Sequence, residues 1–481
     1  MIEGLKPYAE YKESGSKWLG EVPRHWSLRR LGASITDCAN GVWGSDPNGK
    51  DDLICVRVAD FDRVSHRVSL KKKTLRAIPL SARSRRLLRS GDLLLEKSGG
   101  GDLQPVGAVV SYDHDEPAVC SNFVARMPVA NGYISHFVVS LHFTLYAARI
   151  NVLSIKQTTG IQNLDSKAYL REVVAFPPPD EQAAIVRFLD HANRKIDGFI
   201  RAKRKLIGLL NEQKQAIIHR AVTRGLHPDV PLKPSGIPWL GDIPKHWEAR
   251  AFARMSRVVR GSSPRPAGDK RFFHGDFMPW VTVGEVTKDR EMYLKATETF
   301  LTQMGAERST MFPAGTLILT NSGATLGVPK ILELNACAND GIVAFLGLRP
   351  LIQKPFAYLF LSTLTSRLRD EMRQGGTQPN LNTGIVRRIV CPVPPIAEQE
   401  AILKYVERES APLNTAIART EREIALMQEY RTRLTADLVT GKLDVREAAA
   451  KLPDLPTDAA APAEPLTDEA PEESETEEAE A

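Results

Sequence analysis

The feature that most constrains this chain is a long internal repeat. Residues 15–26, Gly-Ser-Lys-Trp-Leu-Gly-Glu-Val-Pro-Arg-His-Trp, return as residues 236–247, Gly-Ile-Pro-Trp-Leu-Gly-Asp-Ile-Pro-Lys-His-Trp, at an offset of 221. Likewise Pro-Pro-Pro-Asp-Glu-Gln at 177–182 returns as Pro-Pro-Ile-Ala-Glu-Gln at 394–399, at an offset of 217. Solenoid repeats span only about 20–50 residues. The period therefore indicates a whole domain plus a long helix, duplicated in tandem, so that one chain can read a polymer at two separate places.

Each copy opens with short apolar strands separated by Gly, Pro and Asn turns. The alternating segment 54–60 corresponds to 280–285, and segment 91–99 corresponds to 315–323. Alternation of apolar and other residues predicts half-buried strands, so we expect a strand scaffold that both copies share. The connecting segments differ strongly between the copies, as expected if these loops read different targets.

A long stretch with helical periodicity follows each of these regions. Its apolar residues recur at steps of three and four or their sums, and they form two stripes: Ile185, Leu189, Ile196, Ile200, Ile207, Leu210 and Ile217 in the first copy, and Ile402, Val406, Leu413, Ile417, Ile424, Met427, Leu434 and Leu438 in the second. This pattern predicts two long helices that bury their stripes against each other. Ordinary surface helices on separate cores are the alternative, but helices of about 40 residues far exceed the usual mean of about 12.

Residues at the expected helix ends have typical capping chemistry. Asp180 is predicted to cap the first helix, and Gly225 and Gly441 fit the position just after each helix. Pro412, which follows Ser410, is expected to kink or restart the second helix because proline lacks the N–H of the helical hydrogen bond.

The formal net charge of +6 conceals a strong asymmetry. Residues 452–481 hold 11 Asp and Glu and no Lys or Arg, which leaves 47 acidic and 64 basic residues, or +17, in the rest of the chain. A body this basic suggests a polyanionic partner, although many basic surfaces serve only solubility. The acidic tail is expected to be disordered and mainly to solvate the chain.

Signatures of export, membrane insertion and catalysis are absent from the sequence. No apolar run approaches about 18 residues, and the five cysteines contain no Cys-x-x-Cys pair. A phosphate-binding Gly-rich loop, an [Asp/Asn]-Pro-Pro-[Tyr/Phe] motif and a metal-ligand spacing of histidines are also missing. We therefore expect a cytoplasmic protein with reduced thiols, no metal and no catalytic site of its own.

The repeated motifs resemble those of the specificity subunit of type I restriction-modification systems, from residue 15 to residue 446. The resemblance rests on the doubled Trp-Leu-Gly-x-[Ile/Val]-Pro-x-His-Trp openings, the Pro-Pro-x-x-Glu-Gln helix starts and the similar helix ends at 221–226 and 438–445. It implies an α+β chain with two similar mixed α/β target recognition domains, related by a pseudo-twofold and alternating with two long helices packed as an antiparallel coiled coil. The implied segments are 1–177 (first recognition domain), 178–226 (first spacer helix), 227–394 (second recognition domain), 395–446 (second spacer helix) and 447–481 (disordered acidic tail).

The resemblance also implies partners and cofactors. Each recognition domain would read one half of a bipartite, asymmetric site on double-stranded DNA. Two modification (methyltransferase) subunits would dock on the helices and bring S-adenosylmethionine. Two restriction/translocase subunits, where present, would bring ATP and Mg²⁺. The alternative is a scaffold protein that binds nucleic acid without sequence preference, and a hidden nuclease or methyltransferase is a third class.

Residues that differ between the copies are the better candidates for reading bases, whereas shared ones fit phosphate contacts or loop structure. The predicted DNA-contacting residues are Asn40, Trp43, Ser45, Lys97, Thr158, Thr159, Gln162 and Asn163 in the first copy, and Arg260, Ser262, Ser263, Arg265, Asn321, Thr377, Gln378 and Asn380 in the second. Arginine can bind guanine through two hydrogen bonds, and asparagine and glutamine can bind base edges or phosphates. For any single residue, an ordinary polar loop is at least as good an explanation.

Overall fold

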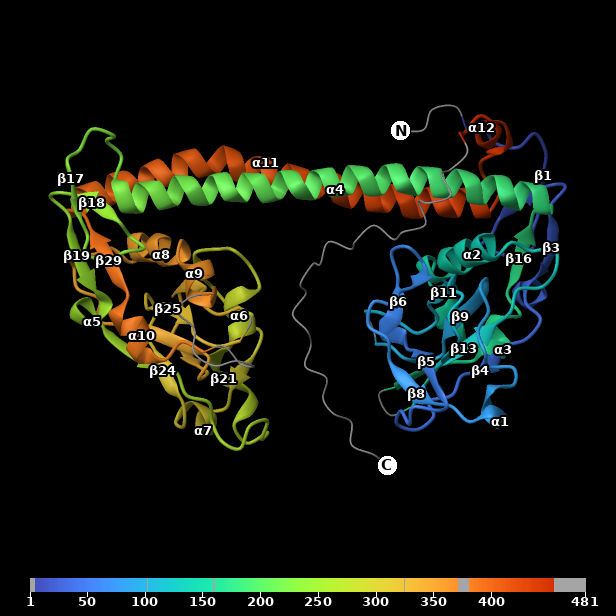
Figure 1. Cartoon of the computed structure of the whole chain (residues 1–481), viewed down its shortest axis with the longest axis horizontal. Helices are drawn as coiled ribbons and strands as arrows, with labels where there is room; N and C mark the ends of the chain where they lie inside the picture. The colour runs from blue at the N-terminus through green and yellow to red at the C-terminus, as the bar shows by residue number, and fades with distance from the viewer. Residues whose placement is uncertain (1–4, 102, 159–160, 324, 371–379, 454–481) are drawn as a thin grey trace. The chain divides into compact units, whose positions relative to one another are not determined.

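The computed structural model, drawn in Figure 1, describes residues 5–101, 103–158, 161–323, 325–370 and 380–453. The acidic tail predicted to be disordered lies outside these residues, except for its first few positions. The chain forms two compact units. Unit 1 comprises Met1–Lys203 and Arg422–Ala481, and unit 2 comprises Arg204–Glu421.

Unit 1 is built on a six-stranded sheet with the order β4-β13-β9-β11-β7-β6. Its strands are β4 (Ala39–Asn40), β6 (Phe61–Asp62), β7 (Arg67–Val68), β9 (Asp92–Glu96), β11 (Val109–Tyr112) and β13 (Val124–Met127). Helix α2 (Ser135–Ala147) packs on β9 and β11 (Figure 1). Because β9 is covered on both faces, its three consecutive leucines, Leu93, Leu94 and Leu95, are fully buried.

Smaller sheets complete unit 1. The order β12-β5-β8 joins β5 (Asp52–Val56) in parallel to β12 (Ala118–Cys120) and antiparallel to β8 (Leu75–Ala77). The order β10-β15-β14 joins β10 (Ser98–Gly99), β15 (Ile161–Leu164) and β14 (Ile155–Thr158). Further strands and α-helices of unit 1 are β1 (Tyr11–Glu13), β2 (Glu21–Pro23), β3 (Ser27–Arg30), β16 (Val173–Phe176), α1 (Leu80–Arg83), α3 (Ser166–Tyr169) and α12 (Arg446–Ala450).

Unit 2 has a five-stranded sheet, β20-β28-β25-β26-β22, beside a four-stranded one, β23-β21-β27-β24. These strands are β20 (Arg257–Arg260), β21 (Phe273–Val281), β22 (Tyr293–Leu294), β23 (Phe300–Leu301), β24 (Thr310–Phe312), β25 (Leu317–Thr320), β26 (Pro329–Leu332), β27 (Ala336–Ala338) and β28 (Ile342–Leu346). The others are β17 (Leu232–Pro234), β18 (Asp242–Pro244), β19 (Glu248–Ala251), β29 (Val390–Val393), α5 (Phe252–Met255), α6 (Val283–Thr287), α7 (Gln303–Ala306), α8 (Lys354–Ser362), α9 (Thr365–Asp370) and α10 (Thr383–Arg388).

The two units use the same strand pairings. In unit 2, β21 is parallel to β27 and antiparallel to β23, as β5 is to β12 and β8 in unit 1. Strand β25 lies between β26 and β28, as β9 lies between β11 and β13. The segments that the sequence matched, 54–60 with 280–285 and 91–99 with 315–323, thus occupy corresponding places in the sheets.

The repeated Pro-x-His-Trp motif anchors the first turn of each long helix. In unit 1, the Glu181 carboxylate of α4 (Pro179–Arg224) accepts hydrogen bonds from Tyr8 Oη and from Trp26 Nε1 (3.0 Å), and it lies 2.8 Å from His25 Nε2. In unit 2, the corresponding Glu398 of α11 (Ile396–Val439) lies 2.8 Å from His246 Nε2. The repeated histidines therefore help to position the two helices.

The glutamine that follows each of these glutamates is buried and fully bonded. Gln182 accepts from Ile134 N (2.9 Å) and donates to Pro177 O (3.0 Å). Gln399 accepts from Gln353 N and donates to Pro394 O, both at 2.8 Å. The Glu-Gln repeat thus ties the start of each helix to the domain before it.

The helix ends agree only partly with the sequence prediction. Gly225 and Gly441 have φ of +76° and +77°, so each adopts the left-handed conformation that ends a helix. Asp180, however, does not cap α4, because the helix starts at Pro179 and Asp180 lies within the first turn. Helix α11 runs through Pro412 without a restart.

Within each unit, part of α4 packs beside part of α11. In unit 1, Asp197 pairs with Arg431, and Lys203 pairs with Glu423 at 2.6 Å. Partner numbers fall as α4 advances, so these segments are antiparallel. Of the predicted stripe residues, those that are buried are Ile185, Leu189, Ile196, Ile200, Ile402, Val406, Leu434 and Leu438. Those that are only partly buried are Ile207, Leu210, Ile217, Leu413, Ile417, Ile424 and Met427, and next to Ile217 it is Ile218 that is buried.

Among the described residues, no helix is long and apolar enough to cross a membrane.

Candidate nucleic-acid interface

The predicted residues Asn40, Trp43 and Ser45 lie in one exposed loop of unit 1, residues 40–48. The loop begins at Asn40, the last residue of β4, and is fastened to β8 by two backbone hydrogen bonds between Ser45 and Ala77, of 3.1 and 2.9 Å. The Trp43 ring, 39% exposed, lies under the Arg76 guanidinium at 4.7 Å. Arg76 also forms an ion pair of 2.6 Å with Asp46. An aromatic face, a guanidinium and a carboxylate are therefore presented together.

Three further polar side chains extend this surface. Lys97 Nζ donates to Asn40 Oδ1, and Ser98 Oγ donates to Asn163 Oδ1 at 2.6 Å. Asn40 and Asn163 are exposed, so the structure brings Asn40, Lys97 and Asn163 close together from three distant parts of the sequence. The side chain of Thr158 and all of Thr159 lie outside the described residues.

Gln162 has a different position from its neighbour Asn163. Its side chain is buried, and its Oε1 accepts the Val106 N–H at 3.3 Å. Because residues alternate along β15, Asn163 is exposed where Gln162 is not. This corrects the expectation that Gln162 lies on the DNA-contacting surface.

In unit 2 the corresponding loop, residues 260–265, is organised around Asp340. The Arg260 Nε donates to the Asp340 carbonyl, Ser263 Oγ donates to the Asp340 carboxylate, and Arg265 Nη2 lies 3.2 Å from that carboxylate. The hydroxyl of Ser263, aided by both arginines, lowers the pKa of Asp340. Ser262 instead bonds Thr310, with 2.9 Å between the two hydroxyl oxygens. Arg260 and Arg265 are exposed and can turn toward an anion or a base edge.

Asn321 does not lie on this surface. Its side chain is fully buried, and its Nδ2 donates to Asn380 Oδ1 (3.3 Å) and to Leu381 O (3.2 Å). It therefore holds the 380–381 segment in place, which corrects its predicted role as a DNA contact. Asn380 is partly exposed, whereas Thr377 and Gln378 lie outside the described residues.

Two glycines that the sequence prediction did not use determine where these loops run. A Cβ atom on Gly41 would lie 2.1 Å from the carbonyl oxygens of Cys120 and Ser121, and one on Gly261 would lie 2.3 Å from Asn339 O. Each loop therefore crosses the end of a parallel strand at a distance that only glycine permits. The signal available in the sequence was a glycine in both copies at an offset of 220.

Sequence reasoning also missed Arg76 and Asp340, which organise the two loops. Both are far from their loops in the sequence, by 30 or more positions, so no local pattern connects them. In the described part of the chain, no group of three or more His, Cys, Asp or Glu side chains could hold a metal ion.

Comparison with known proteins gives this surface a context. Residues 244–425 match the family described as type I restriction modification DNA specificity domain. The chain is 26% identical over 165 residues to the MjaIX specificity subunit of a type I restriction enzyme of Methanocaldococcus jannaschii, across 34% of this chain and 38% of that protein. It is 22% identical over 306 residues to the MjaVIII specificity subunit of the same organism, across 60% of this chain and 66% of that protein. The matches thus span less than two thirds of either relative.

A solved structure has the same fold. One chain of a structure described as the basis of complex assembly and conformational transition of the type I R-M system superposes with a TM-score of 0.58 at 15% identity, covering 88% of this chain and 99% of that one. The resemblance carried by the repeated motifs is confirmed: the matched domain and both relatives are described as specificity domains or subunits of type I restriction-modification systems.

Proposed function

We propose that this chain is the DNA sequence-specificity subunit of a type I restriction-modification complex. One observation carries the proposal: matching strand scaffolds in the two units present different exposed loops at the same place. Loop 40–48 offers Trp43 stacked on Arg76, whereas loop 260–265 offers two arginines held around Asp340. Two readers with one framework and different loops suit a bipartite, asymmetric site.

The chemistry of each loop fits direct reading of DNA. Exposed arginines such as Arg265 can bind the O6 and N7 of guanine in the major groove, and Asn40 can bind adenine. Neighbouring lysine and arginine side chains would bind phosphates, which position a protein on the duplex without reading its sequence. The buried Asn321 and Gln162 would hold the loops in shape.

In this proposal the recognition domains comprise residues 1–177 and 227–394. The helices of 178–226 and 395–446 pack as an antiparallel coiled coil with pseudo-twofold symmetry, and they set the distance between the half-sites. A helix of about 40 residues spans roughly 60 Å. Half-sites one DNA turn apart are about 34–36 Å apart from centre to centre, so such helices are long enough to space two readers.

The catalytic steps would belong to partner subunits in the cytoplasm. Two methyltransferase subunits would dock on the helices and supply S-adenosylmethionine, and restriction/translocase subunits would supply ATP and Mg²⁺. This chain would contribute DNA binding and assembly, and no catalytic group.

A domain exchange tests the proposal. Residues 30–175 are replaced by the recognition domain of another family member, and methylated bases are mapped across the genome of cells that carry the complete system. The expected result is that one half of the target changes and the other half stays. A folded, assembled chimera that loses both halves would contradict the assignment of one half to each domain.

Binding measurements separate this function from a non-specific scaffold. A specific DNA-binding protein prefers its target over random duplex by about 10³-fold or more at physiological salt. Equal affinity for a mapped target and a scrambled duplex would favour the scaffold.

A further inference from the structure

Unit 2 carries a cluster of exposed arginines outside the loop that reads DNA. The arginine cluster consists of Arg254, Arg257, Arg349, Arg387 and Arg388. The first three line a pocket at the junction of α5, β20 and the end of β28, where the backbone N–H of Arg349 bonds the Met255 carbonyl at 2.9 Å. Helix α10, which carries the other two, packs against α5 and β20. Within the described residues, none of the five has an ion-pair partner.

The internal repeat shows that the fold does not require this charge. In unit 1, Ala130 N bonds Ser34 O at 2.9 Å, as Arg349 N bonds Met255 O in unit 2. Likewise Leu31 N bonds Glu172 O, as Phe252 N bonds Ile389 O. These matched bonds show which residue of unit 1 corresponds to which residue of unit 2. In the order given above, the counterparts of the five arginines are Ala33, Thr36, Ala130, Leu170 and Arg171. One scaffold thus carries five positive charges in unit 2 and one in unit 1.

The arginine cluster is continuous with the candidate interface of unit 2. Arg257 starts β20, and Arg260 ends it where loop 260–265 begins, about 10 Å further along the strand. Helix α10 follows directly after the Asn380–Leu381 segment that Asn321 holds in place. Two of the elements that carry these arginines, β20 and α10, are therefore direct continuations of segments that the proposed function assigns to DNA.

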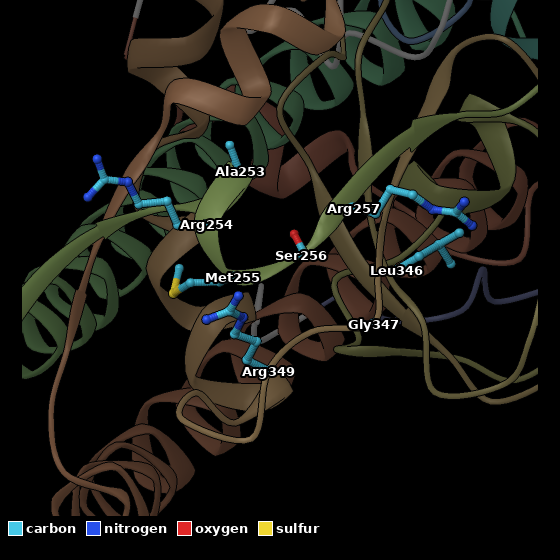
Figure 2. A pocket seen from close by; sticks show the side chains of 8 residues that line it. All are labelled: Ala253, Arg254, Met255, Ser256, Arg257, Leu346, Gly347 and Arg349. Carbon is cyan, nitrogen blue, oxygen red and sulfur yellow. The ribbon is translucent and has the colours of Figure 1, made fainter.

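The arrangement of the side chains indicates the shape of the ligand. Figure 2 shows the guanidinium groups of Arg254, Arg257 and Arg349 pointing in different directions around the pocket, without a common focus. A single compact anion would require convergent donors, whereas a chain of separate phosphates can engage each arginine alone. The pocket's other lining residues, such as Ala253 and Gly347, leave the surface open to an extended partner.

On this geometry, we propose that the arginine cluster binds backbone phosphates of the DNA beside the half-site read by unit 2, so that this half contributes more of the salt-dependent affinity. The inference rests on the proposed function, since it requires that unit 2 bind DNA. It predicts an asymmetric reader, in which unit 1 depends more on its loop contacts and unit 2 holds the duplex more strongly.

The test measures how binding depends on salt. The full-length chain carrying Arg254→Gln, Arg257→Gln and Arg349→Gln is titrated with a fluorescent mixed-sequence duplex of about 30 base pairs, roughly three turns, from about 50 to 200 mM KCl. Each phosphate contact contributes about 0.9 to the slope of log K against log salt. Loss of three contacts should therefore lower the slope by about 2.7, while the mapped target sequence stays the same.

Two controls isolate the cause. Lys17→Gln, Arg29→Gln and Arg30→Gln remove the same charge from exposed framework positions of unit 1 and should leave the slope nearly unchanged. Lysine at the three cluster positions should restore the slope, because a phosphate contact needs charge rather than a guanidinium fork.

The outcomes separate the two proposals. If the unmodified chain binds DNA with a steep slope and the glutamine variant has the same slope, the inference fails while the proposed function stands. If the glutamine variant changes the target sequence, or loses a protein partner with its slope intact, the cluster reads bases or docks protein, and the inference is again overturned. If the unmodified chain shows no preference between mapped and scrambled targets, the proposed function fails first.

Discussion

The carboxylate at the start of each long helix allows a prediction that uses one half of the chain as the control for the other. In unit 1, Glu181 has a side chain only 4% exposed and accepts from Tyr8 and Trp26, both buried. In unit 2, Glu398 is 22% exposed and its partner is the half-exposed His246. The Nε1 of Trp247, which corresponds to Trp26, makes no hydrogen bond.

The two alanine substitutions should lower the stability by different amounts, because they leave different hydrogen-bond donors without an acceptor. Glu181→Ala deprives two buried donors of their acceptor, and a buried unsatisfied donor costs about 1–3 kcal/mol, or roughly 2–6 kcal/mol for the two. Glu398→Ala removes an exposed pair worth about 0–1 kcal/mol. Each carboxylate also lies in the first turn of its helix, where a negative charge contributes about 0.3–1 kcal/mol, but this contribution is common to both and cancels. We expect Glu181→Ala to lower the local stability by at least about 1 kcal/mol more than Glu398→Ala does.

Hydrogen exchange read by mass spectrometry suits this comparison. A chain with two units need not unfold in one step, so a single unfolding free energy is not well defined. Exchange reports the local opening free energy of peptides at the start of α4 and at the start of α11 separately. Glu181→Gln is a control for the cavity that alanine would leave. Glutamine has nearly the volume of glutamate, but it has one acceptor oxygen where the carboxylate has two. Equal protection losses in the two variants, or a larger loss for Glu398→Ala, would refute the reasoning.

Two further predictions concern the scaffold. Gly261→Ala should lower the stability of unit 2 by about 1–3 kcal/mol, because the added Cβ would lie 2.3 Å from Asn339 O, whereas Gly101→Ala, which has open space, should change little. Hydrogen exchange of the peptides around each glycine checks this. Burial lowers the pKa of His142 to about 3, below the usual value of about 6.5. Its folded-state pKa is the lower one, so unit 1 should lose stability as pH falls from about 6.5 toward 3, by about 2 kcal/mol at pH 5. His142→Gln should flatten this pH dependence in exchange measurements, and an unchanged slope would count against it.

Periodic and local features of the sequence predicted much of this fold. The stripes of α4 and α11, the glycines after their ends and the equivalence of strands β9 and β25 depend on spacing that is visible within a short window. The errors are also local: the start of α4 was predicted two positions too late, with Asp180 as its cap, because Pro179 can itself be the first residue of a helix. Helix α11 continues through Pro412, so the restart that the sequence allowed does not occur, and the helix gains most of its stability from packing.

The candidate site was less predictable because its geometry depends on contacts between distant segments. Asn321 was equated with Lys97 from their positions in the repeat, and the positions do correspond. The side chains differ in environment: Lys97 reaches Asn40 at the surface, whereas Asn321 is buried against Asn380. A matching position fixes the backbone but not the contacts of the side chain. Asp340 and Arg76 could be found only after the loops they hold had been located in space.

Duplication within one chain offers a way to separate framework from function that a single domain lacks. Gln182 and Gln399 make the same pair of backbone contacts in their own units. Such identity indicates a contact that the scaffold itself requires. The five clustered arginines of unit 2 are the opposite case, because they are not repeated. The corresponding backbone of unit 1 folds with alanine, threonine or leucine at four of the five positions. The fold therefore does not require this charge, which supports the proposal that unit 2 uses it to bind DNA phosphates.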